Sequence, residues 1–251
     1  MTKKSWIIFA VACVVIIGGL VYFSRQDKAD VETVDASSIV EASDQNGNIG
    51  DRVLGAKDAK VVIFEYGDYQ CPGCAAAAPA LKKVADDYSD KVALVFRNFP
   101  IVSAHPNALA AASAAEAAGH QGKFWEMHEK LYINQTAWQN LSGANRTEYF
   151  MNAAKDLDLD AERLRTDIED PNIRKKINFD TALAKKQGVA GTPTIFVNGD
   201  RVSDWRVKDG KVRKDGSERE SLYVWSSPEN FEKYVIIPAL NAAGVSTEKS
   251  E

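Results

Sequence analysis

The stretch KVVIFEYGDYQCPGC, residues 60–74, decides how this chain folds. It joins a run of β-branched and aromatic residues to an alanine-rich segment. The pattern predicts a buried strand over Lys60–Tyr66 and a helix over Cys71–Tyr88. Pro72 falls in the first turn of that helix, where a missing N–H costs no hydrogen bond. The two cysteines of the stretch therefore lie at a strand-to-helix junction.

Cys71 and Cys74 are the only cysteines outside the N-terminal apolar segment, and their spacing is typical of disulfide exchange. The reactive species in that chemistry is a thiolate, which the unpaired N–H groups of a helix N-terminus stabilise. We therefore expect Cys71 to be the exposed sulfur that a client thiolate attacks. Cys74, one turn further into the helix, is expected to be its buried partner, which resolves the mixed disulfide.

Glu65 interrupts the apolar strand six residues before Cys71. Two interpretations remain open at this point. In the first, Glu65 lies on an edge strand and faces water. In the second, it is a half-buried carboxylate below the disulfide that moves protons to or from Cys74, and burial raises its pKa.

Gly191-Thr192-Pro193-Thr194 begins a further predicted strand, Thr194–Val197. Proline at the first residue of a strand can simply mark its start. Alternatively, the bond before Pro193 is cis, which an X-Pro bond permits at small cost. A cis turn there would present the Thr192 backbone for β-like pairing with an extended client peptide.

The rest of the chain predicts a mixed α/β architecture. The expected elements are, in order, a strand at Lys91–Phe99, a helical block at 106–187, the strand Thr194–Val197 with a turn at Asn198-Gly199, a charged extended hairpin within 206–221 and a helix at Pro228–Leu240. The simplest arrangement is one mixed sheet flanked by helices, with the helical block inserted as a cap.

Residues Trp6–Phe23 carry no charge and would span about 27 Å as a helix, which suffices to cross a bilayer. We interpret residues 6–23 as an uncleaved membrane anchor, after a short cytoplasmic N-terminus over 1–5 that contains two lysines. A cleavable signal peptide and a lipid attached at Cys13 are the alternatives. The polar residues 24–50 predict a flexible linker. The following domain would then lie outside the cytoplasm, where disulfide chemistry is permitted.

Composition and ligand spacing exclude several other classes of protein. The net charge is −4, and without the first 25 residues it is −7, which argues against a nucleic-acid surface. Zinc would need two ligands besides the cysteine pair, and only His105, His120 and His128 are available, all in the helical block. We expect these histidines to start or pack helices and the chain to hold no metal. A structural staple is equally disfavoured, because so short a loop constrains little chain entropy.

Several motifs together resemble one known family, the DsbA-like thiol-disulfide oxidoreductases of the thioredoxin superfamily. They are Glu65, the CPGC pair, the helix interrupted by Pro79 and the GTPT turn. The resemblance covers roughly Val53 to Leu240 and includes the motifs Phe96–Pro100, His105-Pro106, Ala114–Ala118 and Gln121–Trp125.

The resemblance implies a thioredoxin-like domain over 51–245, with a helical insertion at about 103–188. It also implies roles for particular residues: Cys71 as the nucleophile, Cys74 as the resolving cysteine, Glu65 as the buried acid, and Pro193 as the cis-proline after Thr192. The N-terminus looks like those of membrane-tethered forms from Gram-positive bacteria. A quinone-linked membrane partner for reoxidation is implied, and exchange itself requires no cofactor.

We therefore expect a monomeric bacterial enzyme on the outer side of the cell membrane that introduces disulfides into reduced or misoxidised client proteins. Two alternatives remain open. One is a disulfide reductase or isomerase that uses the same cysteines. The other is a non-catalytic peptide-binding or chaperone module on the same fold.

Overall fold

A five-stranded mixed sheet forms the centre of the structure, a computed structural model that describes residues 6, 9, 12–16, 18, 29–216 and 221–250. Its strand order is β1-β3-β2-β4-β5. The central strand β2 runs parallel to β3 and antiparallel to β4, and β1 runs antiparallel to β3. The strands are β1 (Arg52–Gly55), β2 (Val61–Gly67), β3 (Val92–Asn98), β4 (Thr194–Val197) and β5 (Asp200–Arg201).

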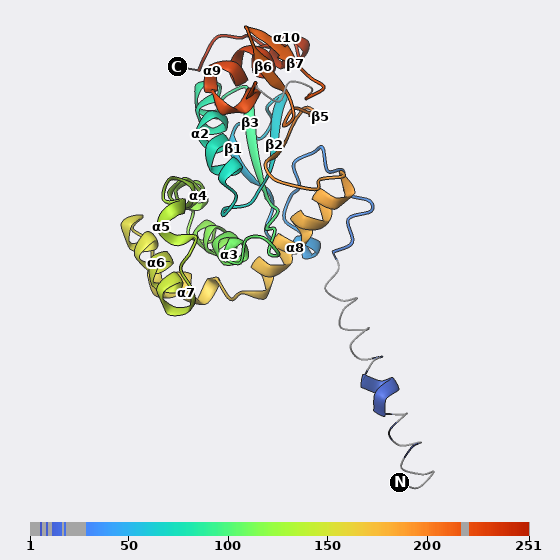
Figure 1. Ribbon diagram of the computed structural model, residues 1–251, viewed down its shortest axis with the longest axis vertical. Helices are drawn as coiled ribbons and strands as arrows, with labels where there is room; N and C mark the ends of the chain where they lie inside the picture. The colour runs from blue at the N-terminus through green and yellow to red at the C-terminus, as the bar shows by residue number, and fades with distance from the viewer. Residues whose placement is uncertain are drawn as a thin grey trace.

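The helix α2 (Pro72–Asp87) follows β2 directly, as the sequence predicts. The helical block lies between β3 and β4, and Figure 1 shows most of it as a layer of its own beside the sheet. Its helices are α3 (Ala108–Gly119), α4 (Phe124–Ile133), α5 (Gln135–Trp138), α6 (Gly143–Asp156), α7 (Ala161–Asp167) and α8 (Pro171–Lys186). The last of these, α8, returns the chain to the sheet (Figure 1).

The charged segment after β4 forms the predicted hairpin, which belongs to a second, three-stranded sheet of order β7-β6-β8. Its strands are β6 (Arg206–Lys208), β7 (Lys211–Arg213) and β8 (Leu222–Tyr223). The predicted last helix is present in pieces: the 3₁₀ turn η2 (Val224–Ser226) precedes α9 (Pro228–Phe231), the π-helical turn η3 (Glu232–Ile236) and α10 (Ile237–Ala242).

The core has two layers because alternate side chains of a strand point to opposite faces of the sheet. Val61 and Ile63 of β2 pack with α2 and the C-terminal helices. Phe64 and Tyr66 pack on the other face, against α8. Both faces of β2 are therefore covered, which explains its almost continuous apolar sequence.

Residues 29–50 differ from the flexible linker that the sequence predicts for 24–50. Val31 and Ala36 are buried, and η1 (Asp44–Asn46) forms a short 3₁₀ turn that packs on α8. Lys186 of α8 donates hydrogen bonds to the carbonyls of Val31, Glu32 and Val34. Backbone carbonyls of this segment thus hold it against the domain by accepting hydrogen bonds from charged side chains of distant elements.

The anchor predicted for residues 6–23 falls largely outside the described residues. Within the described part of the chain, no helix has both the length and the apolar character needed to span a bilayer.

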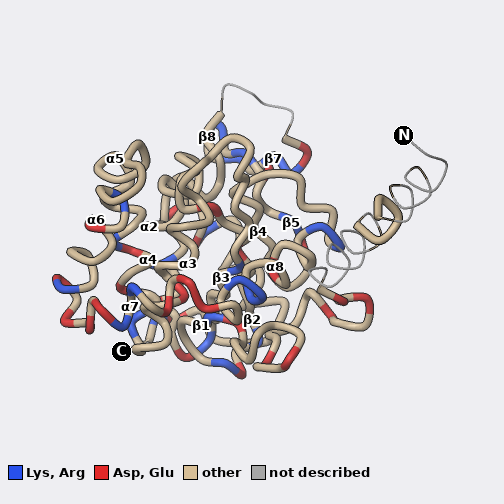
Figure 2. Tube along the Cα trace, turned by 90° about the horizontal axis from the view of Figure 1, so that it is seen from below, with Lys and Arg blue, Asp and Glu red and all other residues tan. Residues whose placement is uncertain are grey.

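Figure 2 shows basic and acidic residues side by side on several elements of the folded domain, α6 and α7 among them.

A buried charge network joins the start of β1 to β3 and α8. Asp51 accepts from Arg97 Nη2 at 2.8 Å and from Lys176 Nζ at 3.2 Å, and all three side chains are fully buried. Lys176 also pairs with Asp180 at 2.7 Å, and Asp180 accepts from the backbone N–H of Asn98 at 3.1 Å. Each buried charge therefore has a partner, and together they fix α8 to the sheet.

Removing one carboxylate from this network should destabilise the fold strongly. In Asp51→Ala, two buried cations lose a partner, so the free energy of unfolding should fall by about 3–5 kcal/mol. Urea unfolding measures this loss. Lys82→Ala, which breaks the exposed Lys82–Asp86 pair, should change it by less than about 0.5 kcal/mol. Similar losses in the two variants would contradict a structural role for the buried network.

Candidate active site

The two cysteines lie where β2 delivers the chain to the N-terminus of α2. Cys71 is the N-cap residue, with extended backbone angles, and Pro72 is the first helical residue. Cys74 is fully buried one turn further along. Cys71 has only 9% of its surface exposed, which is less than the sequence led us to expect. Cys71 is nonetheless the more accessible of the two sulfurs.

The turn before β4 covers Cys71. The Thr192–Pro193 peptide bond is cis, and the Cys71 sulfur lies 3.4 Å from the Thr192 carbonyl oxygen. Gly73 permits this close approach, because a Cβ at that position would lie 3.0 Å from Pro193 Cδ. The structure thus brings together the residues of the CPGC and GTPT motifs, which are far apart in the sequence.

The environment of Cys71 favours its thiolate and lowers the pKa of its thiol to about 5. The main cause is the Cys74 thiol, which donates a hydrogen bond to the Cys71 sulfur. The backbone N–H groups of Gly73 and Cys74, which have no helical acceptor, donate as well. At pH 7 the thiolate of Cys71 therefore outnumbers its thiol by about a hundredfold.

Cys74 has the opposite character. Burial raises the pKa of its thiol well above the ordinary value, and the Cys71 and Glu65 side chains add to the effect. The Cys74 sulfur accepts from the backbone N–H of Asp68 at 3.5 Å. In the dithiol state, one sulfur is thus an anion and the other keeps its proton.

Glu65 lies on the central strand, paired with Phe96 of β3 and Ile195 of β4. The edge-strand interpretation is therefore wrong, and the side chain is fully rather than half buried. Neither carboxylate oxygen has a hydrogen-bond partner in the described part of the chain. Burial, with a smaller effect from Cys71, raises the pKa of Glu65 to about 8. Glu65 is consequently a carboxylic acid at neutral pH that can donate a proton.

An aromatic cluster from α4 and β3 covers the Glu65 side of the sheet. His128 lies within it, 3.0 Å from the Tyr69 hydroxyl, and burial lowers its pKa to about 3, so the imidazole is neutral. The hydroxyl of Tyr132 is buried without a partner among the described residues, and a Cβ at Gly67 would lie 3.0 Å from it. Because Gly67 and Glu65 share one face of β2, this hydroxyl faces the same interior region as the carboxyl.

The three histidines are dispersed rather than gathered at a metal site. His105 contacts Asp68 at 2.8 Å, His120 lies 3.6 Å from Asp167, and His128 belongs to the aromatic cluster. Among the described residues, no group of three or more potential ligands is placed to hold a metal ion.

Asp68 is a structural residue of the site that the sequence analysis missed. Its buried carboxylate accepts from the backbone N–H groups of Gln70 and Ile101, at 2.8 Å each, and contacts His105. These bonds fix the turn that leads into Cys71. The only sequence signal is a polar Gly67-Asp68 pair at the end of a strand, which is typical of many turns.

A hollow of about 300 Å³ opens beside α2, on the side of α4. The hollow is lined on this side by four residues of α2: Ala75, Ala78, Pro79 and Lys82. They follow Cys71 at helical spacing, so they lie on one face of the helix. Lysine and glutamate side chains accompany a mainly apolar lining, which comprises Ala75, Ala78, Pro79, Lys82, Trp125, His128, Glu129, Tyr132 and Ile133. An apolar surface therefore adjoins the helix that carries both sulfurs.

Comparison with known families gives a match to the family described as thioredoxin, over residues 47–213. The chain belongs to the thioredoxin family. The probable disulfide bond formation protein D of Bacillus anthracis is 30% identical over 198 residues, which cover 77% of this chain and 86% of that protein.

Other relatives are much longer proteins. The Na(+)/H(+) antiporter NhaA 1 of Salinispora arenicola is 41% identical over 151 residues, which make up 60% of this chain but 22% of the antiporter. The chain thus spans less than a quarter of the length of the antiporters it matches.

Solved structures show the same fold. A thioredoxin-like oxidoreductase from Silicibacter pomeroyi DSS-3 is 32% identical, with a TM-score of 0.51 over 60% of this chain and 82% of that one. BdbD from Bacillus subtilis is 22% identical, with a TM-score of 0.58 over 81% and 98% of the two chains. Wolbachia pipientis α-DsbA1 is also 22% identical, with a TM-score of 0.57 over 77% and 92%. The prediction of a thioredoxin-like α/β fold is confirmed.

Alkylation should detect the Cys71 thiolate directly. In a Cys13→Ser background, the rate of Cys71 modification by iodoacetamide should rise with pH around a midpoint near 5 and then level off. Cys74 should remain unmodified, since it is buried and protonated. Cys71→Ala should lose the fast phase. A midpoint near 8.5, the value of free cysteine, would contradict the stabilised thiolate.

Glu65→Gln should make the fold more stable at alkaline pH. The folded pKa of Glu65, about 8, lies above its unfolded value, so the unfolded chain releases this proton first as pH rises. The wild type should therefore lose stability relative to Glu65→Gln between about pH 4.5 and 8, by about 3 kcal/mol at pH 7. Urea unfolding at several pH values measures this difference.

Glu116→Gln is the matched control, because Glu116 is also buried but pairs with Arg52 at 2.7 Å and accepts from Asn98. This variant should be less stable than the wild type. A Glu65→Gln difference that does not grow with pH would show that Glu65 is ionised in the folded protein.

Proposed function

We propose that this chain is an extracytoplasmic disulfide oxidase, which transfers a Cys71–Cys74 disulfide to reduced client proteins. The proposal rests on the pKa values of the two thiols, which are shifted in opposite directions. The pKa of Cys71 is lowered and that of Cys74 is raised. A thiolate exists only in the reduced pair, so its stabilisation favours the dithiol over the disulfide. A disulfide at this position should therefore accept electrons readily.

In the first step, a client thiolate attacks the sulfur of Cys71. A bond forms between the client and Cys71, the Cys71–Cys74 bond breaks, and the electron pair passes to the Cys74 sulfur. Glu65 then protonates Cys74, because the carboxyl keeps its proton at neutral pH and the Cys74 thiol binds a proton more tightly. Cys74 is thereby prevented from attacking the mixed disulfide at once.

In the second step, another thiolate of the client attacks the client sulfur of the mixed disulfide. The client disulfide forms and Cys71 leaves as a thiolate. A thiolate of low basicity is a good leaving group, so the same hydrogen bonds that lower the Cys71 pKa accelerate product release. The client has lost two electrons, and the Cys71–Cys74 pair has gained them.

The surroundings of Cys71 suit an extended peptide. The backbone of Thr192 lies beside the sulfur, where a client strand can form β-like hydrogen bonds. The hollow along α2 and α4 offers space for an apolar client side chain. These contacts hold the client thiolate near Cys71 with no requirement for a particular sequence.

The location of the enzyme forms part of the proposal. The uncharged stretch 6–23, preceded by lysines, supports a single membrane anchor with the catalytic domain outside a bacterial cell. The protein would act there as a monomer on reduced or misoxidised proteins. A quinone-linked membrane protein would return the pair to its disulfide form by accepting the two electrons.

The direction of exchange can be measured by equilibrating the protein with glutathione buffers. An oxidase should have a potential near that of strong oxidants such as DsbA, about −120 mV, or of protein disulfide isomerase, about −180 mV. A value near that of thioredoxin, about −270 mV, would contradict the proposal and favour a reductase.

Covalent trapping tests exchange itself. Cys74→Ala should accumulate mixed disulfides with extracytoplasmic proteins, because the resolving sulfur is absent, and these adducts should dissociate on reduction. Cys71→Ala is the control and should accumulate none. A different pair of results would instead support a non-catalytic peptide-binding module. In that case Cys71→Ala would still bind clients, and Cys74→Ala would form no covalent adduct with them.

A further inference from the structure

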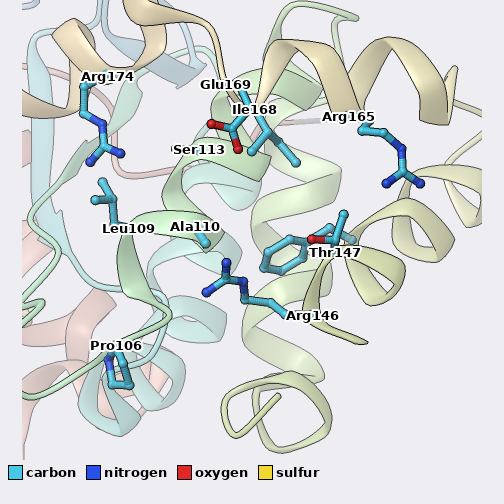
Figure 3. A pocket seen from close by; sticks show the side chains of 11 residues that line it. Pro106, Leu109, Ala110, Ser113, Arg146, Thr147, Arg165, Ile168, Glu169 and Arg174 are labelled. Carbon is cyan, nitrogen blue, oxygen red and sulfur yellow. The ribbon is translucent and has the colours of Figure 1, made fainter. Parts of the chain in front are cut away.

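The helical insertion contains a second cleft, of about 330 Å³, which the disulfide chemistry does not use. Figure 3 shows it between α3, α6, the end of α7 and the start of α8. Its apolar lining residues include Leu109, Ala110, Phe150 and Ile168. The sequence analysis gave no sign of it, because its lining comes from four helices.

Three arginines and one glutamate also line this cleft. Arg174 forms no ion pair within the described part of the chain, and Arg165 has only an exposed contact of 3.4 Å with Glu162. Arg146 donates to Asn107 Oδ1 at 2.9 Å, which fixes the side chain but leaves other guanidinium donors available. Glu169 is the single acidic residue of the lining, so the cleft is positively charged.

The arrangement of the arginines restricts the kind of ligand. In Figure 3, the guanidinium groups of Arg146, Arg165 and Arg174 occupy separate places around the rim and do not converge on one point. A single phosphate could pair well with only one of them. A chain with several spaced carboxylates can pair with all three, since each guanidinium binds a carboxylate in a bidentate manner.

Hydrogen bonds connect this cleft to the redox site. Arg146 holds Asn107, whose backbone N–H donates to Gln70 Oε1 at 2.8 Å. Gln70 immediately precedes Cys71. Hydrogen bonds therefore link the cleft to the residue that precedes Cys71, although different helices form the two sites.

We propose that this cleft, lined by Arg146, Arg165 and Arg174, is a docking site for an acidic segment of a client polypeptide. Carboxylates of the segment pair with the arginines, and an apolar side chain covers Leu109 and Phe150. That the segment belongs to a client rests on the proposed function. The binding itself does not, because it involves no sulfur.

The test is fluorescence anisotropy with a labelled, cysteine-free peptide of alternating glutamate and leucine at low ionic strength. The double variant Arg165→Gln/Arg174→Gln should bind about two- to 25-fold more weakly than the wild type, since each exposed ion pair contributes up to roughly fivefold. The control variant Lys155→Gln/Lys175→Gln removes the same charge from exposed positions of α6 and α8 outside the cleft. It should bind as the wild type does.

Equal weakening in the two double variants would overturn the proposal, because binding would then depend on net charge alone. Binding of inorganic phosphate but not of the peptide would also overturn it, in favour of a site for small anions. Because the peptide has no thiol, these outcomes are independent of the trapping experiment. A failure of disulfide exchange would leave the acidic-peptide site intact, and the reverse also holds.

Discussion

The junction between β2 and α2 is the constraint on which the rest of the structure depends. β2 is the central strand, covered on both faces, so its end is fixed by two neighbouring strands and two layers of side chains. The chain leaves it through a turn that Asp68 holds and enters α2 with Cys71 at the cap position. The helix N-terminus, the cis-proline turn and the buried acid then all lie around one sulfur.

Burial raises the pKa of each acidic group around that junction, but the protonation state that results differs between them. It keeps Glu65 and Cys74 protonated, because each lies deep in the interior without a cation beside it. Cys71 is partly buried as well, but hydrogen-bond donors outweigh the loss of water and stabilise its anion. Elsewhere in the interior, Asp51 and Lys176 remain charged because each has a partner. The fold thus holds paired groups that stay charged apart from unpaired groups that stay protonated.

Short-range patterns in the sequence predicted the elements of the fold and most of the site, since β2, α2 and the CPGC pair are specified locally. The rest depends on contacts between distant residues. The sequence left the burial of Glu65 open because a single strand does not reveal whether it is central or at an edge. Residues 29–50 are polar, like a linker, but their carbonyls serve Arg97 and Lys186, whose positions only the fold determines. Tyr132 was missed for the same reason, because its neighbour Gly67 belongs to another element.

Under the proposed membrane anchor, the docking of residues 29–50 onto α8 would also limit how far the domain can stand from a bilayer. With the membrane anchor proposed for 6–23, only residues 24–28 separate its last residue from the packed segment. Fully extended, the six Cα–Cα steps from residue 23 to residue 29 span at most about 22 Å. The domain would then be confined to a thin layer above the lipid surface, where two-dimensional diffusion brings it to an electron acceptor in the same membrane more often than to one free in solution.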